Sequence, residues 1–436
     1  MHTPGTPVVL AMRDGLRIRH DHVDTLRRLG LRIHLLTEEE QARADGRYTS
    51  VRLLPEHTTD RELEDRVTQA LGDTGSVFAL TFQETDIVAV GRANERHGVP
   101  WSRPEADAVA RDKSLQRARL TAAGVPAPRY RAVGAAGAGP EALEHVGLPC
   151  VVKPTRGASS SHVELVRTAE EATAALEAVE RLARSGAHHF YDTLPNEWAL
   201  VEEYLPGEEV TCDGVVVGGR FHLGGVHTKV LPDTPWFEED LYTLPHGDPA
   251  VEREIADAMQ AMVSSLDLEV SLFNAELRRD ARGRFRVVEF STRISGGHVY
   301  RNIRDVHRVD LVELFVRAAL GEDGVDALAG DRHPGAQATC IKFVYRDGTV
   351  VSNGAGRAER SAAFAAYYPL AAPGQEVRSA PEGFDLCGLL SVRAPYDPGQ
   401  HPAQVHRVVE EVLGDLDLVV APFPSSVHED DRASAR

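Results

Sequence analysis

The feature that most constrains this chain is a pair of apolar runs that predicts a β-hairpin carrying two glutamates. The runs are Leu272–Arg279 and Arg284–Phe290, and the turn between them contains Arg282-Gly283. A two-residue loop at that dipeptide, or a four-residue loop around it, places Glu276 opposite Glu289 with Cβ atoms about 5 Å apart. Two carboxylates so close cost free energy unless one is protonated or a cation lies between them. Mg²⁺ suits such a pair, because it takes one or two carboxylates together with substrate phosphate oxygens.

The two glutamates also have a simpler interpretation. Arg278 and Arg286 belong to the same hairpin, and a solvated edge balanced by these arginines needs no metal. For an arbitrary pair of glutamates, the solvated edge is the commoner case. The decision between the two interpretations therefore depends on the rest of the chain.

The N-terminal part of the chain alternates short apolar runs with amphipathic stretches. The expected strands are Val8–Met12, Leu31–Leu36 and Val77–Phe82, and the expected helices are His22–Leu29, Asp60–Leu71 and Thr85–His97. This βαβ order favours a parallel sheet. A long helix is expected next, at Glu105–Ala123, because Gly124 and Pro126 stop it. A length of 436 residues exceeds one ordinary core, so the fold class is α/β, or α+β overall, with two to three domains.

Lysine is scarce in this sequence. Only four of the 48 basic residues are lysines, and codon bias toward arginine is the usual cause of such an imbalance. A chain this poor in lysine is expected to keep it where a compact ammonium does what a guanidinium cannot. Lys153 ends an apolar strand that begins at Cys150, and a lysine inside a strand needs an anionic partner. The loop Thr155–Val163 that follows is small and rich in hydroxyls, so it can fold over phosphates.

A second candidate binding segment is an acidic junction between two predicted strands. Glu202-Glu203-Tyr204-Leu205 is followed closely by Glu209. Carboxylates at such a junction suit ribose hydroxyls, and the adjacent backbone suits the edge of an adenine. The alternative is a plain acidic turn.

Charge and cysteine content exclude several classes of protein. The formal net charge is −18, which leaves no basic footprint for nucleic acid. No apolar run approaches about 18 residues and the first residues lack a signal-peptide pattern, so neither a membrane span nor secretion is expected. The four cysteines are far apart, which argues against a compact zinc site and favours reduced thiols in the cytoplasm.

The candidate segments form a recognisable set when they are taken in order along the chain. Lys113 precedes Lys153 and its loop, the acidic junction follows, and the two hairpin glutamates and Arg293 come last. With this order the chain resembles the ATP-grasp superfamily over roughly Asp112–Leu320. The resemblance implies an ATP-grasp fold with an N-terminal parallel α/β domain at 1–104, a central two-lobed ATP-binding region at 105–320 and a C-terminal lobe with a frayed tail at 321–436. The flap subdomain of the central region would span about 128–205.

The resemblance also implies a role for each residue of the set. Lys113 and Lys153 would bind ATP phosphates, and the catalytic cations would be Lys153, Lys229 and Arg293. The flap would contain Gly157, Ser159, Ser160 and Ser161. The adenine hinge would be formed by Glu202, Glu203, Tyr204 and Leu205, and the ribose carboxylate would be Glu209. The ligands of Mg²⁺, or of Mn²⁺ in its place, would be Glu276, Glu289 and Ser291. Two residues depart from the family pattern, because Ser291 stands where asparagine is frequent and His162 where the flap commonly has glycine.

Two further segments are similar to the dipeptide-forming, amino-acid ligase branch of that superfamily. In Trp236–Tyr242, the resemblance places Glu239 at a substrate amine and Tyr242 where a histidine is usual. The polar segment Ser295–Arg304 is a candidate for holding a substrate carboxylate, through Gly296, Gly297, His298, Arg301 and Arg304. Surface salt bridges are the alternative for the two arginines, and a surface loop is the alternative for Trp236–Tyr242.

The implied activity is ATP- and Mg²⁺-dependent ligation of a carboxylate to an amine through an acyl-phosphate, which releases ADP and phosphate. The expected substrates are small molecules, above all amino acids. Two other functions remain open, namely an ATP-grasp carboxylase or purine-type ligase that uses bicarbonate or formate, and a nucleotide-binding regulator without turnover. A homodimer is expected on base rates alone, whereas neither nucleic acid nor a membrane is an expected partner.

Overall fold

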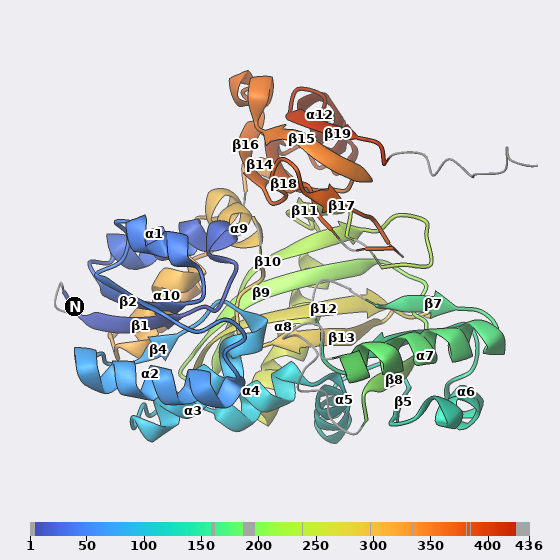
Figure 1. The fold of residues 1–436 in the computed structure, drawn as a ribbon, viewed down its shortest axis with the longest axis horizontal. Coiled ribbons are helices and arrows are strands. Elements are labelled where there is room, and N and C mark those ends of the chain that lie inside the picture. The colour runs from blue at the N-terminus through green and yellow to red at the C-terminus, as the bar shows by residue number, and fades with distance from the viewer. Residues whose placement is uncertain are drawn as a thin grey trace, which may run out of the picture.

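The computed structural model describes residues 5–157, 162–185, 197–237, 239–296, 298–333, 335–380, 382–383 and 385–423. The expectations for Ser159, Ser160, Ser161, Gly297 and the C-terminal tail fall outside these residues. The described strands form four sheets, which Figure 1 shows as an N-terminal α/β unit at the left, a large central sheet, a smaller sheet at the right and a C-terminal lobe above. Parallel and antiparallel pairing both occur, which confirms the predicted fold class.

The N-terminal unit is built on a parallel sheet in the order β3-β2-β1-β4. Its strands are β1 (Pro7–Ala11), β2 (Arg32–Thr37), β3 (Ser50–Leu53) and β4 (Ala79–Leu80), and its helices are α1 (His20–Arg28), α2 (Asp60–Thr74) and α3 (Ile87–Arg96). The predicted strands and helices are confirmed, and β3 is additional. Two short 3-10 helices, η1 (Leu16–Arg19) and η3 (Glu84–Asp86), follow the carboxyl ends of β1 and β4.

The prediction of one helix over 105–123 is wrong. The chain forms α4 (Pro104–Arg111) and α5 (Lys113–Ala122), separated by Asp112 in an extended conformation with φ −126° and ψ 112°. The carboxylate of Asp112 accepts a hydrogen bond from the N–H of Ser114 at 2.9 Å and caps α5. The N–H of Lys113 donates to the backbone oxygen of Thr155 at 2.8 Å, so the break joins the start of α5 to the loop after the lysine strand.

The smaller sheet presents one face to two helices and the other to the central sheet. Its strands, in the antiparallel order β5-β8-β6-β7, are β5 (Tyr130–Val133), β8 (Ala199–Glu203), β6 (Cys150–Pro154) and β7 (Glu164–Val166). Cys150 and Val152 pack in one core with α6 (Gly139–Val146) and α7 (Ala169–Ser185). Because side chains alternate along a strand, Val151 and Lys153 point to the opposite face.

The central sheet has eight strands in the order β13-β12-β9-β10-β11-β14-β18-β16. They are β9 (Glu209–Val217), β10 (Arg220–Val230), β11 (Leu241–Leu244), β12 (Val270–Arg279), β13 (Phe285–Ser291), β14 (Gln337–Val344), β16 (Phe364–Pro369) and β18 (Gly388–Pro395). The helices α8 (Pro249–Ser265), α9 (Val299–His307) and α10 (Leu311–Ala319) pack against it. The sheet crosses the whole molecule and carries the predicted metal strands at one edge (Figure 1).

The β12–β13 hairpin pairs Glu276 with Glu289, as predicted, but its loop is not the predicted one. Next to the turn Arg279 pairs with Phe285, and further along Leu277 pairs with Val287, which is one residue away from the expected register. Val288 is an extra residue in a β-bulge that restores the pairing of the glutamates. Its backbone oxygen accepts a hydrogen bond from the Arg117 side chain, so a tertiary contact stabilises the bulge.

The C-terminal lobe adds a three-stranded antiparallel sheet and a helix, namely β15 (Gly348–Gly354), β17 (Glu376–Val377), β19 (Asp417–Ala421) and α12 (Ala403–Leu413). The short helix α11 (Val325–Ala329) packs on α10 and β9 instead. The remaining short 3-10 helices are η2 (Glu40–Ala44), η4 (Ala136–Ala138) and η5 (Gly356–Arg360). Among the described residues, no helix has the length and apolar character that a membrane span requires.

Candidate active site

A cleft of about 700 Å³ lies between the smaller sheet and the β12–β13 hairpin. Its apolar walls include Val151, Val163 and Val288. It is also lined by most of the residues predicted to bind ATP and metal, namely Lys113, Lys153, Gly157, Glu202, Glu203, Tyr204, Leu205, Glu209, Glu276 and Glu289. An apolar cleft with a few converging charged groups is the usual form of a small-molecule site.

Lys153 is buried in the wall of this cleft and is paired with Glu202. Its Nζ lies 2.6 Å from Oε2 of Glu202, and each side chain is 3% exposed. The same carboxylate binds Nε of Arg117 at 2.6 Å. Burial lowers the pKa of Lys153 against the effect of Glu202, and the two cations together hold the pKa of Glu202 below its ordinary value in spite of its burial. The Glu202 side chain is therefore bound to Lys153 and Arg117, and adenine contacts at this junction stay a prediction.

Lys113 bridges the start of α5 and the metal strand. Its Nζ lies 2.8 Å from Oε1 of Glu289. Burial disfavours the charge of Glu289, but Lys113, with help from Lys153 and Arg293, outweighs it and lowers the pKa of this carboxyl. Glu289 is therefore ionised near neutral pH, and the two predicted phosphate lysines lie close to it.

Lys229, on β10, forms ion pairs with three carboxylates near Glu276 of the hairpin. Its Nζ lies 2.7 Å from Glu209, 3.1 Å from Glu276 and 3.9 Å from Glu239. Burial disfavours its charge, yet these carboxylates hold the pKa of Lys229 well above its ordinary value. Burial raises the pKa of Glu276 to about 7, because Lys229 only partly offsets it and Glu209 and Glu289 add to it. The facing glutamates thus differ, since Glu289 is ionised near neutral pH and Glu276 is only partly ionised there.

The two facing glutamates fit a bound Mg²⁺. Burial is the main cause of the raised pKa of Glu276, and the facing Glu289 adds to it, so a divalent cation between the two carboxylates would offset both effects. Ser291, the third predicted ligand, instead donates its hydroxyl hydrogen to Glu84 at 2.8 Å. Within the described residues, no group of three or more His, Cys, Asp or Glu could hold a metal. Phosphate oxygens and water would therefore have to complete the coordination, as is usual for Mg²⁺.

Arg278 is a site residue that the sequence did not indicate. Its guanidinium lies between two aromatic rings, 5.4 Å from the centroid of Tyr204 and 5.3 Å from that of Phe237. It donates to Oε2 of Glu209 at 2.9 Å. Arg278 therefore orients the predicted ribose carboxylate and connects it to the aromatic part of the cleft.

Arg293 is held by a carboxylate from the N-terminal unit. Its Nε lies 2.7 Å from Oε2 of Glu84, which belongs to η3 and also accepts the hydrogen bond from Ser291. No pattern in the sequence marks Glu84 as a site residue. A residue at a strand end of the parallel sheet thus completes the site built on the metal strands, as expected for the carboxyl edge of such a sheet.

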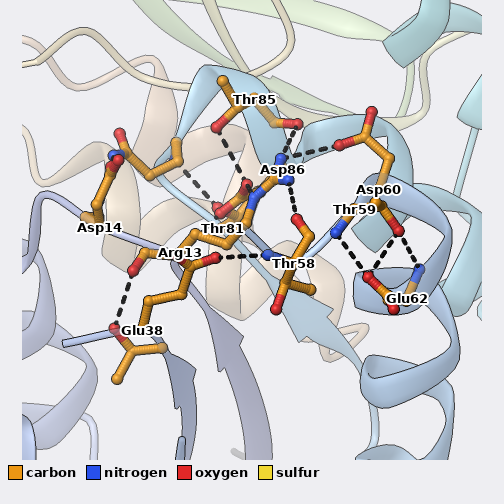
Figure 2. A network of polar contacts seen from close by, with 12 residues as sticks. Arg13, Asp14, Glu38, Thr58, Thr59, Asp60, Glu62, Thr81, Thr85 and Asp86 are labelled. Atoms are coloured by element: carbon orange, nitrogen blue, oxygen red, sulfur yellow. Dashed lines mark hydrogen bonds and ion pairs between the residues drawn. The ribbon is translucent and has the colours of Figure 1, made fainter. Parts of the chain in front are cut away.

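A buried network of polar contacts fixes η3 in its place (Figure 2). At its centre, Nε of Arg13 binds Asp86 at 2.7 Å and another of its nitrogens donates to the backbone oxygen of Thr85 at 3.0 Å. Arg13 also donates to the backbone oxygen of Thr58 at 2.7 Å and to Asp60 at 2.9 Å. The network joins the end of β1 to the start of α2, so Glu84 stands on a rigid support.

The predicted substrate residues Glu239 and Tyr242 lie beside Lys229. Tyr242 pairs with Lys229 across β10 and β11, and the ammonium lies 5.1 Å from the centroid of its ring. The phenol hydroxyl donates to Oε1 of Glu239. The two side chains thus come together next to the Lys229 cluster, and their contact with a substrate remains a prediction.

The other predicted substrate residues lie before and within α9, and their contact with a substrate stays a prediction. The segment after Ser295 forms α9, where His298 is fully buried with Nε2 3.0 Å from the backbone oxygen of Leu389. Arg301 and Arg304 each lie 3.8 to 3.9 Å from Asp21 and Asp305. Their positive charges therefore meet carboxylates of the chain itself, in accord with the salt-bridge alternative.

Asp213 on β9 anchors the loop that follows Arg293. Its carboxylate accepts hydrogen bonds from the backbone N–H of Ser295 at 2.7 Å and from the hydroxyl of that residue at 2.8 Å. Asp213 is fully buried, and burial raises its pKa to about 6 in spite of these bonds. No local pattern marks this residue, because its partner lies 82 positions away.

Replacing Asp213 by asparagine is expected to change how stability depends on pH. The native carboxyl keeps its proton up to about pH 6, whereas the unfolded chain loses it near pH 4. The stabilisation from this proton is complete below pH 4 and is lost as pH rises to 6, a loss of about 3 kcal/mol. Asparagine cannot ionise, so the melting temperature of the variant relative to the parent should rise between pH 4.5 and 7.5. A difference that stays constant over this range would contradict the pKa of about 6.

Comparisons with known proteins agree with this arrangement. Residues 146–301 match the family described as ATP-grasp domain. The chain is 25% identical over 276 residues to an alanine–anticapsin ligase of Bacillus subtilis, which is 60% of this chain and 58% of that one. It is 30% identical over 325 residues to carnosine synthase 1 of Gallus gallus, which is 68% of this chain and 33% of that one. The matches therefore span little more than half of the first relative and a third of the second.

The crystal structure of an L-amino acid ligase from Bacillus licheniformis has the same fold. It superposes with a TM-score of 0.81 over 96% of this chain and 100% of its own, at 18% identity. The family match lies on the part of the chain that carries Lys153, the acidic junction and both hairpin glutamates. By this match, residues 146–301 form an ATP-grasp domain, and the chain as a whole is similar to the L-amino-acid ligase branch of that superfamily.

Proposed function

We propose that this protein is an ATP- and Mg²⁺-dependent ligase that joins a carboxylate to an amine, with amino acids as substrates. The observation that carries the proposal is the arrangement of cations around the facing Glu276 and Glu289. Lys113 and Lys153 line the cleft, and Lys229 and Arg293 adjoin its glutamates. Such preorganised charge is what phosphoryl transfer to a carboxylate requires. The preference for amino acids is supported by the relatives, whose names describe an alanine ligase, a carnosine synthase and an L-amino acid ligase.

Each of these residues has its own role in the proposed reaction. When bound, Mg²⁺ would neutralise phosphate charge and polarise the phosphoryl group that is transferred. Lys113 and Lys153 hold the phosphates, and Arg293, fixed by Glu84, orients the substrate carboxylate whose oxygen attacks the γ-phosphorus as ADP leaves. The amine then attacks the acyl carbon and phosphate leaves, so the products are an amide, ADP and phosphate. Glu239 is proposed to hold that amine beside Lys229.

The test is phosphate release from the purified protein with ATP, Mg²⁺ and all pairs of amino acids, followed by product masses. A ligase should release ADP and phosphate in equal amounts, together with a product whose mass is that of both substrates less one water. Incorporation of labelled bicarbonate without such a product would favour the carboxylase alternative. A melting temperature that rises with ATP and Mg²⁺, while no ADP forms with any pair, would favour a regulator without turnover.

A further inference from the structure

Arg19 is a buried arginine without a carboxylate partner. It ends η1 at the carboxyl edge of the parallel sheet, and 3% of its surface is exposed. Within the described part of the chain, its guanidinium donates to the backbone oxygen of Ser295 at 2.7 Å and contacts Nε2 of His22 at 3.3 Å, and no carboxylate binds it. Its Nε is buried without a hydrogen-bond partner in the same part of the chain. Buried guanidinium groups are normally paired with anions, because removing the charge from water is costly.

The carboxylates around Arg19 are committed to other groups. Asp213 uses both of its oxygens on Ser295, and Glu84 binds Arg293 and Ser291. Burial and the nearby positive charge of Arg293 lower the pKa of Arg19 to about 9. Arg19 thus stands beside Arg293 as a second cation, and the anionic groups of the protein leave it only partly neutralised.

The guanidinium of Arg19 lies next to Gly296. A Cβ atom built on this glycine would lie 3.7 Å from Nη2 of Arg19. Among the described residues, and leaving aside the two neighbours of Gly296 in the chain, no other atom lies within 4 Å of that Cβ atom. The position of this missing side chain therefore adjoins the guanidinium, next to the loop that begins at Arg293. A ligand atom at this position would meet Nη2 of Arg19 and the backbone of the loop.

We propose that Arg19 binds the carboxylate that the amine substrate keeps during ligation, so that this substrate is an amino acid with a free carboxylate. The inference rests on the ligase function proposed above. The carboxylate oriented by Arg293 is consumed when the amide forms. Arg19, as a second buried cation near Arg293, therefore suits a carboxylate that does not react, namely that of the amine substrate. Arg301 and Arg304, the cations expected for this role from the sequence, already meet Asp21 and Asp305.

The test compares the amino acid on the amine side with its carboxamide, using the substrate pair that releases phosphate fastest. In the parent, the KM of the carboxamide should exceed that of the amino acid at least about tenfold, because a charge-assisted hydrogen bond is lost. In Arg19→Gln, the KM of the amino acid should rise at least about tenfold while that of the carboxamide stays unchanged. An effect through folding alone would raise the KM of the amino acid and that of the carboxamide alike. Equal increases in the two KM values would therefore overturn the proposal. The proposal would also be overturned if Arg19→Gln raised KM only when the substrate that supplies the reacting carboxylate carries a second carboxylate, because Arg19 would then bind that group instead.

Arg17→Gln is the matched control. Arg17 lies on the same short helix, is exposed, and also donates to a backbone oxygen of another part of the chain, that of Pro369 at 2.5 Å. This variant should keep the parent preference for the amino acid over its carboxamide. A melting-temperature shift of normal size with ATP and Mg²⁺ shows that each variant is folded.

A second measurement separates this inference from the ligase function. With ADP and Mg²⁺ present, each of the twenty amino acids and its carboxamide is added singly, and the melting temperature is recorded. In the parent, amino acids should raise it more than their carboxamides do. Arg19→Gln should shrink that difference to the part that binding of a carboxylate by Arg293 contributes. If no pair of amino acids releases phosphate, the proposed ligase function fails, and the melting shifts alone decide the role of Arg19. Absence of any such difference in the parent overturns the carboxylate site.

Discussion

Phosphate release by a Glu289→Gln variant is expected to fall below about 1% of the parent rate, while the fold is retained. Glutamine has the same size as glutamate, and its amide oxygen can still accept a hydrogen bond from Lys113, whose Nζ lies 2.8 Å from the native carboxylate. The variant loses the glutamate whose pKa is lowered and which is therefore charged near neutrality. Mg²⁺ relies on one or two carboxylates in such sites, and its stabilisation of a transferred phosphoryl group is worth several kcal/mol. A loss of about 2.7 kcal/mol already reduces the rate a hundredfold.

The measurement is phosphate release as a function of Mg²⁺ concentration at saturating ATP. Glu269→Gln is the matched control, because Glu269 is an exposed glutamate just before β12 and lies outside the cleft. This control should match the parent at every Mg²⁺ concentration. An unchanged rate in Glu289→Gln would show that the hairpin glutamate is not a metal ligand. A variant that loses its melting transition would instead reveal a structural role for the Lys113–Glu289 pair.

The pairing of Glu276 with Glu289 was predicted from a loop at Arg282-Gly283, and the pairing is observed although that loop is not. Without a bulge, the observed register next to the turn would have placed Val288 opposite Glu276. The register next to the turn was not predictable, because it depends on the bulge at Val288. The bulge is stabilised by Arg117, which is 171 positions away, and nothing near the turn in the sequence indicates it.

The helix break at Asp112 was hidden for a similar reason. Residues 105–123 have helical propensity throughout, and aspartate inside such a run is only mildly unfavourable. The break becomes favourable because Asp112 caps α5 and its carboxylate binds Arg156 at 3.2 Å, while the N–H of Lys113 bonds to Thr155. These partners belong to the loop after the lysine strand, so a long-range contact overrides the local preference.

Some site residues could be identified from the sequence and others could not, for the same physical reason. Lys113, Lys153 and the hairpin glutamates stand in segments with a recognisable order, whereas Glu84 and Arg19 stand in short 3-10 helices that no periodicity marks. Arg19 meets Ser295 at a separation of 276 positions. The residues that the N-terminal unit contributes could therefore be identified only after the chain had folded around the cleft.

Replacing Lys153 by arginine is expected to lower the rate of phosphate release at least about a hundredfold, although the positive charge is kept. Lys153 is 3% exposed, and its Nζ already lies 2.6 Å from Glu202, which Arg117 binds from the other side. Val151 and Pro154 line the cleft beside it, and a longer side chain with a planar end does not fit a position packed around a lysine. The guanidinium would have to leave Glu202 or extend into the cleft, where it would displace the phosphates. The KM for ATP should therefore rise while the maximal rate falls, and both follow from steady-state phosphate release.

Lys342→Arg provides the matched control, because it makes the same substitution at another lysine in an ion pair. Lys342 on β14 is bound to Asp240 and is 18% exposed, so the longer guanidinium can extend toward solvent. We expect this variant to keep the parent rate, and a rate within about threefold of the parent in Lys153→Arg would contradict the phosphate role. Both variants have the net charge of the parent. Any difference between them must therefore come from the shape and reach of the cation at Lys153, which is the property that would lead a chain so rich in arginine to retain a lysine there.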